Sequence, residues 1–257
     1  MFGIGAIMDS LQVSYISIIT PALGFFVLTG LSLLAIFRGG RKPTNILFAV
    51  ICFMGALINA DVALVNVVPD KNLAIKIDRL TYMVFVFSPP VYIQFVHYFL
   101  GISRRRWLEF LAYGFSAIFL ILTPTDLFIK GFAQFDFGII AQAGKAFHFF
   151  TVLASFTVCY CLYTLFMGMK KTRKNQKKNR IKYILWGLGL SSFLIALNIL
   201  PVSGLNVYPL GNFSFIPAIV LAFGVLRYDL LDMGALIRRG TIYFLLTIVL
   251  TIFYVLI

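Results

Sequence analysis

Residues 44–68 read TNILFAVICFMGALINADVALVNVV, a run in which Asp61 is the only charged side chain. A helix of this length rises roughly 37 Å, which is enough to cross the ~30 Å hydrocarbon core of a bilayer. Because lipid offers no hydrogen-bond partners, a chain that crosses it must be helical or part of a closed barrel. The run is continuously apolar and does not alternate with period two, which favours a helix. This stretch therefore predicts a membrane-spanning helix.

Similar apolar runs recur along the whole chain. Of its 257 residues, 61% are hydrophobic and 12% are charged, whereas soluble domains carry about 25% charged residues. A water-soluble globular domain is excluded, because polar and charged side chains must cover its surface. We predict an all-α, polytopic transmembrane helical bundle of seven spans plus an additional C-terminal apolar helix. The predicted spans are 13–37, 44–68, 80–100, 107–123, 146–169, 183–200 and 213–226, and the additional helix is 241–257.

The loops between the predicted spans alternate in charge. Those after odd-numbered spans carry 17 of the 22 Lys and Arg residues, and those after even-numbered spans carry the other five. Short loops rich in Lys and Arg stay preferentially in the cytoplasm. The distribution predicts a multi-pass membrane protein with an outside N-terminus and a cytoplasmic segment 227–240.

The chain shows no internal repeat or long polar linker. We expect residues 1–233 to form one seven-span region and residues 234–257 to begin a further transmembrane or connecting helix. Residues 241–257 end while still apolar, so we expect the chain to be the front part of a longer polypeptide.

Motifs for catalysis and metal binding are not found. The zincin, phosphate-loop, kinase and nucleophile-elbow patterns are absent from the sequence. With two histidines and three cysteines, we predict no metal site, no cofactor and no catalytic residues. The basic cluster Lys170–Lys182 predicts contact with anionic inner-leaflet lipid. Nucleic-acid binding is not expected, because no aromatic residues lie between these cations.

Polar residues inside membrane spans are costly and therefore indicate function. Asn59, Asp61, His148 and Asn198 share one membrane level in the predicted topology, and we predict that they line an outward-facing ligand crevice. With no cation one helical turn away, Asp61 should face the bundle interior. Alternatively, each residue only hydrogen-bonds a neighbouring helix.

A second candidate region lies in the third span. Pro89 and Pro90 precede Gln94 and His97, which share one helical face. Proline frees backbone carbonyls and kinks a helix, so this segment is a candidate hinge for signal transmission. The alternative is a static kink with an internally hydrogen-bonded histidine.

Two further expectations concern the loops. Glu109 lies near Arg104–Arg106 and should pair with them at the cytoplasmic interface. The loop 124–145 is longer than the others and partly alternates, which predicts a short hairpin or lid over the outer crevice. Its aromatic residues could equally rest at the membrane interface.

Several short stretches resemble a known family. They are LRYDLLD at 226–232 followed by Ile237-Arg-Arg239 and Tyr243, RIKY at 180–183, and Pro89-Pro90 followed by FVHYFLG at 95–101. Together they resemble the N-terminal seven-transmembrane region of bacterial sensor histidine kinases, over nearly the whole chain.

The resemblance implies a sensing module that detects a small-molecule or lipidic signal. It would pass this signal to downstream cytoplasmic kinase or diguanylate cyclase domains of a two-component protein, with a homodimer as a possible assembly. Arg238 and Arg239 would then transmit the motion of the seventh span. No catalytic residue is implied within these residues. The alternative from another class is a membrane transporter or channel subunit, in which Asp61 and the broken third span would form a substrate path.

The charge distribution gives a topology test. Single cysteines at Asn175 or Gln134, in a background without the native Cys52, Cys159 and Cys161, are exposed to an impermeant maleimide in intact cells. The reagent should label Gln134→Cys and not Asn175→Cys. Labelling of Asn175→Cys without labelling of Gln134→Cys would show that the topology is the opposite of the predicted one.

Overall fold

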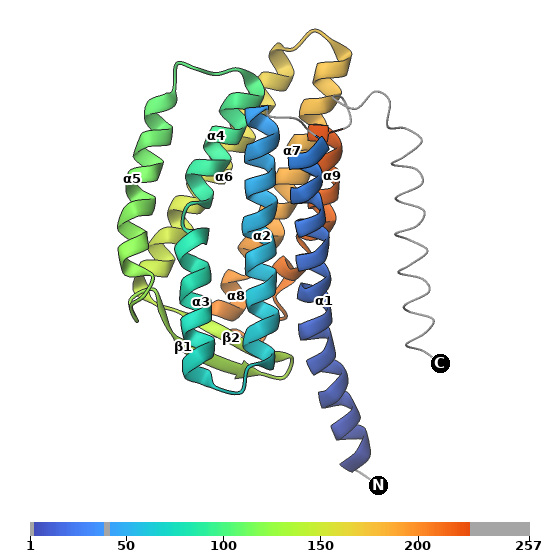
Figure 1. Ribbon diagram of the computed structural model, residues 1–257, viewed down its shortest axis with the longest axis vertical. Coiled ribbons are helices and arrows are strands. Elements are labelled where there is room, and N and C mark those ends of the chain that lie inside the picture. The colour runs from blue at the N-terminus through green and yellow to red at the C-terminus, as the bar shows by residue number, and fades with distance from the viewer. Residues whose placement is uncertain (1–2, 39–41, 227–257) are drawn as a thin grey trace.

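The structure is a computed structural model that describes residues 3–38 and 42–226, with residues 3–14 and 38 described by their backbone alone. It is mostly helical, and its long helices run side by side as a bundle with a small hairpin at one end (Figure 1). In chain order the elements are α1 (Gly3–Arg38), α2 (Pro43–Val67), α3 (Lys71–Phe85), α4 (Ser88–Leu100), α5 (Arg106–Leu122), β1 (Ile129–Phe135), β2 (Gly138–Ala143), α6 (Lys145–Lys171), α7 (Asn175–Leu197), α8 (Ile199–Val202), the 3-10 helix η1 (Leu210–Phe213) and α9 (Phe215–Leu226).

Five segments of the described residues are long and apolar enough to cross a membrane: Tyr15–Phe37, Pro43–Val67, Lys71–Leu100, Lys145–Lys171 and Asn175–Val202. Two of the seven predicted spans fall on shorter helices. Helix α5 has 17 residues, and the last apolar segment, Leu210–Leu226, is a shorter helix that includes η1 and α9. The additional helix predicted at 241–257 lies outside the described residues. The helical, membrane-spanning character is confirmed, and the count of seven spans stays a prediction.

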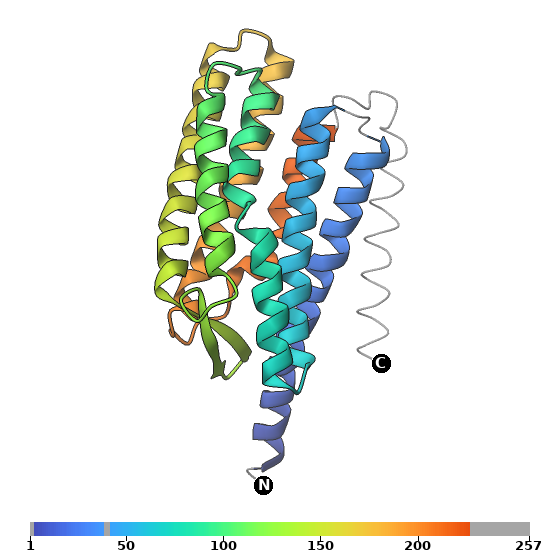
Figure 2. The same cartoon turned by 60° about the vertical axis from the view of Figure 1, so that its left-hand side comes forward.

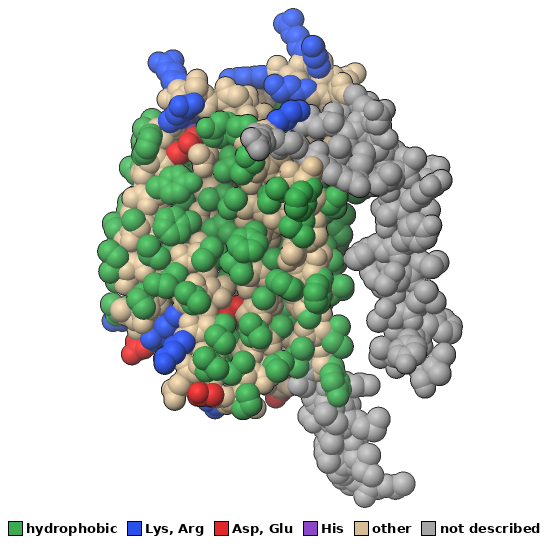
Figure 3. All heavy atoms as spheres, in the orientation of Figure 1, with side chains coloured by type: hydrophobic (Ala, Val, Ile, Leu, Met, Phe, Trp, Pro, Cys, Tyr) green, Lys and Arg blue, Asp and Glu red, His purple; other side chains and the backbone are tan. Residues whose placement is uncertain are grey.

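The charged connections gather at one end of the bundle. The connections α4–α5 and α6–α7 lie at the top of Figure 1, toward which α1 ends and α2 begins, and the hairpin lies at the opposite end. Figure 3 shows Lys and Arg side chains at the top and a broad band of hydrophobic side chains across the middle of this face. We call the two ends the basic end and the hairpin end. Which of them faces the cytoplasm stays a prediction.

The third span differs from the predicted segment 80–100. It begins nine residues earlier, at Lys71, and breaks into α3 and α4 at Val86 and Phe87. Pro90 has no N–H to donate to the carbonyl of Val86, four residues before it. The Ser116 hydroxyl of α5 donates to this buried carbonyl instead, at 2.7 Å. The resulting offset between α3 and α4 is visible in Figure 2.

The predicted hairpin in the loop 124–145 is confirmed. Strands β1 and β2 pair antiparallel, with Phe135 opposite Gly138 at the turn. Phe128 and Ile129, at the start of β1, are fully buried and pack into an aromatic cluster with Tyr82 of α3 and Phe147 of α6. The hairpin therefore closes its end of the bundle and joins the core.

Helices α7 and α9 approach each other closely because small residues lie at their contact. A Cβ atom at Gly187 would be 2.7 Å from the backbone nitrogen of Leu221, and one at Gly224 would be 2.7 Å from Cγ1 of Ile184. Small residues at a helix contact let the two backbones pack together in a membrane.

The close contact predicts a large effect of one methyl group. Gly187→Ala should force α7 and α9 apart and lower the free energy of unfolding by about 1–3 kcal/mol. The matched control is Gly30→Ala in α1, where nothing lies within 4 Å of the added Cβ. This control should be neutral or gain up to about 1 kcal/mol in helix propensity. Thermal unfolding in detergent compares the two, and equal midpoints would contradict the packing described.

Candidate functional site

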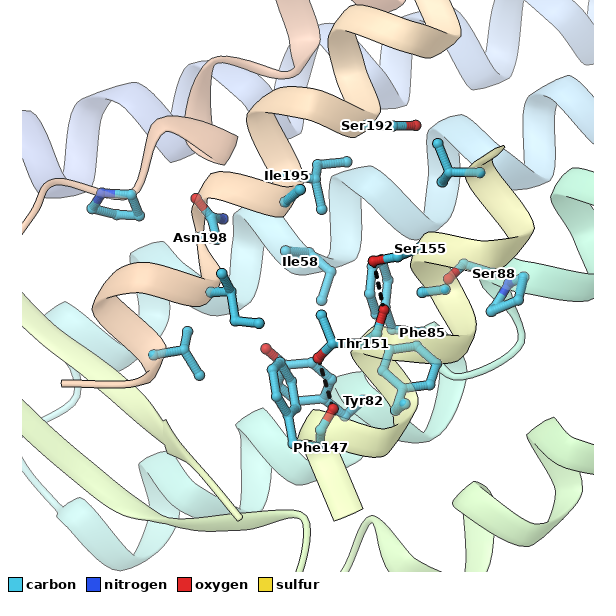
Figure 4. A pocket seen from close by; sticks show the side chains of 18 of the residues that line it. Ile58, Tyr82, Phe85, Ser88, Phe147, Thr151, Ser155, Ser192, Ile195 and Asn198 are labelled. Atoms are coloured by element: carbon cyan, nitrogen blue, oxygen red, sulfur yellow. Dashed lines mark hydrogen bonds between the residues drawn. The ribbon is translucent and has the colours of Figure 1, made fainter. Parts of the chain in front are cut away.

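A cavity of about 450 Å³ lies inside the bundle toward the hairpin end. Its walls come from α2, α3, α4, α6, α7, α8 and β2, so residues distant in the sequence meet around it. Figure 4 shows Tyr82 and Phe85 of α3 beside Phe147 of α6, facing Ile195 of α7 and Asn198 at its C-terminal end across the hollow. Most of the lining is apolar, with a few polar groups among the apolar side chains. Such a cavity suits a small molecule with a largely apolar body.

Two carboxyl groups meet at the wall of this cavity. Asp61 of α2 and Asp78 of α3 both line it, and their side chains are within hydrogen-bonding reach of each other. Asp61 is 4% exposed and Asp78 is 3% exposed. Oδ1 of Asp61 and Oδ2 of Asp78 have no hydrogen-bond partner among the described residues. The expectation that Asp61 faces the bundle interior is confirmed.

The four residues of the predicted crevice do not converge. Asp61 and Asn198 line the cavity, and the Asn198 side-chain oxygen also accepts from the backbone N–H of Gly211 at 2.7 Å. Asn59 is buried against Gly24 of α1, and its amide donates to the carbonyl of Gly55. His148 is exposed and is not part of the cavity lining. A ligand-binding role for any of the four stays a prediction.

Asp78 is the site residue that the sequence analysis missed. It was assigned to an outer loop, because Lys76 and Arg79 flank it and suggest a segment outside the membrane. The structure instead extends the helix to Lys71, which puts Asp78 on the inner face four residues from both Ala74 and Tyr82. The four-residue spacing of Ala74, Asp78 and Tyr82 was the available signal.

A second polar cluster joins three helices near the basic end. His97 of α4 is 1% exposed, and its Nδ1 lies 2.6 Å from Oε1 of Glu109 in α5. Its Nε2 lies 2.8 Å from the hydroxyl of Tyr160 in α6. The expectation that Glu109 pairs with Arg104–Arg106 is therefore corrected. Glu109 is buried on the inner face of α5 and contacts the imidazole, because its helix turns the carboxylate toward α4.

The candidate hinge residues connect the cavity to this cluster. Pro89 lines the cavity, and both Pro89 and Pro90 are buried in the first turn of α4. Further along α4, Gln94 accepts a hydrogen bond from the hydroxyl of Tyr113 in α5 at 2.9 Å, and His97 contacts Glu109. Helix α4 is thus bonded to α5 at two levels between its proline break and the basic end. A hinge role for these residues stays a prediction.

Within the basic cluster, Arg180 has a specific structural position. Its guanidinium donates to the carbonyls of Gly224 and Val225, at 2.8 and 3.0 Å, and lies 5.1 Å from the ring of Phe99. The last carbonyls of a helix lack partners within the helix and carry partial negative charge, so a cation there is favourable. Arg180 therefore fixes the end of α9 against α7 and α4. Arg238 and Arg239 lie outside the described residues.

In the described part of the chain, no three His, Cys, Asp or Glu side chains gather closely enough to hold a metal ion. The three cysteines are free thiols in apolar surroundings: Cys52 and Cys161 are buried and Cys159 is exposed.

The long apolar helices around an internal cavity define a polytopic helical membrane protein. The family model for the N-terminal 7TM region of histidine kinase matches residues 19–234. The chain belongs to this family, which makes it a membrane sensory region of a kinase. No curated protein matches the sequence closely enough to serve as a relative.

The buried cluster predicts a measurable coupling between His97 and Glu109. Removing either partner leaves the other buried without its hydrogen bond, which costs about 1.5–3 kcal/mol when one of the groups is charged. A double-mutant cycle with His97→Ala and Glu109→Ala should therefore give a coupling free energy of about 1–3 kcal/mol in unfolding experiments.

The matched control is Phe110→Ala, next to Glu109 but on the exposed face of α5. Its effect should add to that of His97→Ala within about 0.5 kcal/mol. An additive His97 and Glu109 pair would contradict the described contact.

Proposed function

We propose that this chain is the signal-detecting region of a bacterial two-component protein and that the cavity binds its signal. The signal would be a small or lipidic molecule, and the output would be the activity of downstream cytoplasmic kinase domains, or of a diguanylate cyclase domain. The observation that carries the proposal is the 450 Å³ cavity at the meeting point of helices α2, α3, α6 and α7. Family membership supports the kinase output.

A ligand in this cavity would contact the break between α3 and α4. Pro89 lines the cavity at the break between α3 and α4, where the helix ladder is already interrupted. A ligand that favours one arrangement of the two half-helices shifts the population toward that arrangement. Helix α4 then carries the change to the His97 cluster and to Phe99, beside Arg180.

In this proposal Arg180 passes the change on to α9. It joins α7 to the last carbonyls of α9, and α9 leads along the chain toward Arg238 and Arg239. Movement of α7 or α4 would therefore displace the end of α9. In this proposal Arg238 and Arg239 hold the following segment at the membrane interface, because moving such charges into hydrocarbon costs about 2.5–3.5 kcal/mol each on insertion scales.

The proposed setting is the bacterial cytoplasmic membrane, with the basic end on the cytoplasmic side. The Lys and Arg side chains of the α6–α7 connection are mostly exposed there and suit anionic inner-leaflet lipid. Homodimer formation remains part of the proposal, as an arrangement through which two chains would act on one downstream unit.

The second candidate is a transporter or channel subunit, favoured by one specific observation. A buried pair of acids beside a broken helix is the arrangement expected of a substrate or ion path. The two candidates differ in output, since a transporter moves its substrate without changing phosphorylation.

The proposal predicts that filling the cavity changes kinase output. Ser192 lines the cavity from α7, so Ser192→Trp should place an indole where a ligand would lie and shift basal activity toward the stimulated level. A shift of about 1 kcal/mol would change basal phosphorylation about fivefold. The measurement is histidine phosphorylation from ATP by the full-length protein in membrane vesicles.

Leu190→Trp is the matched control, because Leu190 lies on the same helix but is 48% exposed on the bundle surface. Its basal phosphorylation should equal that of the unmodified protein. If Ser192→Trp leaves phosphorylation unchanged at normal protein levels, the cavity does not control the output and the proposal is wrong. Substrate uptake without phosphorylation would establish the transporter instead.

A further inference from the structure

We propose that the cavity selects a cationic amphiphile, an apolar molecule with an amine or other organic cation as head group, and that this head group lies between Asp61 and Asp78. This proposal deepens the proposed function by naming the chemical class of the ligand. It rests on the cavity being the signal site.

The first argument is the unsatisfied state of the two acids. Oδ1 of Asp61 and Oδ2 of Asp78 are buried without hydrogen-bond partners among the described residues, although both side chains line an open volume. Leaving a buried polar atom unpaired costs about 1–3 kcal/mol, and more when the group is charged. A ligand that brings hydrogen-bond donors to this point recovers that free energy.

The second argument is charge. A hydrogen bond between two carboxyl groups needs at least one proton, so the pair carries at most one negative charge, which a single cation would neutralise. The described residues that line the cavity include no Lys, Arg or His. The charge of the neighbouring Arg79 acts on Asp78, but both of its Nη atoms are directed elsewhere, to Asp126 and to the carbonyls of Pro124 and Ile129. Among the described residues no cation donates a hydrogen bond to either acid, so a cationic ligand would supply a positive partner in direct contact with the pair.

Aromatic rings stand where an organic cation would bind. Tyr82 lies one helical turn from Asp78 on the inner face of α3, and its ring packs edge-on against Phe147 at 5.6 Å. Both rings line the cavity, and Figure 4 shows them together on one side of it. An ammonium group is attracted to aromatic faces as well as to carboxylates, a combination that favours organic cations.

The other residues that line the cavity are mostly apolar and favour a ligand whose remaining part is also apolar. Ile58, Phe85 and Ile195 line the cavity, and the hydroxyls of Thr151 and Ser155 donate to the carbonyls of their own helix. These hydroxyls therefore have no proton to offer a ligand. An inorganic ion suits this lining poorly, because hard cations need about six or more oxygen ligands.

The position of the opening also favours an amphiphile. Ser155 and Cys159 of α6 and Phe193 of α7 line the cavity, and all three are exposed on the outside of the bundle. The cavity therefore reaches the surface between two apolar helices, where lipid would lie. An amphiphile dissolved in the membrane can enter by this route with its apolar end remaining among apolar groups.

The test uses three probes with the same apolar body: octylamine, octanol and octanoate. Their binding to the full-length protein in phosphatidylcholine nanodiscs is measured with radiolabelled probe and corrected by empty nanodiscs of the same lipid. Octylamine should bind saturably and about tenfold or more tightly than octanol, because only the amine forms charge-assisted hydrogen bonds to the acids. Octanoate should bind more weakly than octanol.

The variants identify the source of the preference. Asp61→Asn with Asp78→Asn should reduce the preference for octylamine over octanol to below about twofold, because amides keep the shape but lose the charge. Asp136→Asn, an exposed acid of the hairpin turn that accepts a hydrogen bond from Asn206, should keep it. If the double variant does not fold, Ser192→Trp is the second test. This variant should weaken the binding of octylamine and of octanol to the same extent.

The outcomes separate this inference from the proposed function. Equal saturable binding of octylamine and octanol overturns the selection for a cation and leaves the cavity as a binding site. Tighter binding of octanoate also overturns it. Saturable binding of none of the three overturns the cavity as the signal site, and with it the proposed function.

Discussion

The lack of hydrogen-bond partners in hydrocarbon is the constraint on which the rest of this structure depends. Every polar group that enters the bundle has to find its partner within the protein. Ser116 supplies a donor to the carbonyl that the proline break leaves free, and Asn198 accepts from the backbone of Gly211. Arg180 does the same for the last carbonyls of α9. These contacts hold irregular backbone in place at the points where helices break or end.

Several buried polar atoms of the described residues lack a hydrogen-bond partner, and Asp61 and Asp78 differ from the others because both also line the cavity. Other buried polar side chains join helices, as in the contact of His97 with Glu109 and Tyr160. The two acids instead each have a buried unpaired oxygen and line the cavity. Buried ionisable groups are expensive in a membrane and generally serve function rather than stability. A site that is incomplete without a ligand is what a receptor needs, because the ligand then contributes to the free energy of one state.

The sequence predicted the helical bundle well because apolar length and charge placement are local properties. Residues 44–68 coincide with α2 almost exactly, and the hairpin followed from alternation in the loop 124–145. The site was predicted less completely. Asp78 was missed because neighbouring charges suggested a loop, and only the inner face of a longer α3 reveals it. The contact between His97 and Glu109 depends on how α4 and α5 pack, which spacing along one helix does not encode.

The opening between α6 and α7 determines which ligand concentration would control the response of the proposed sensing region. A ligand that enters there is drawn from the bilayer, so the concentration that governs occupancy is its mole fraction in lipid. Its amount in water matters only through the partition coefficient, and a more hydrophobic compound would act at a lower aqueous dose with the same intrinsic affinity. Cells with more membrane per receptor would dilute the same quantity of compound further. Sensitivity would thus become a property of the membrane as much as of the protein.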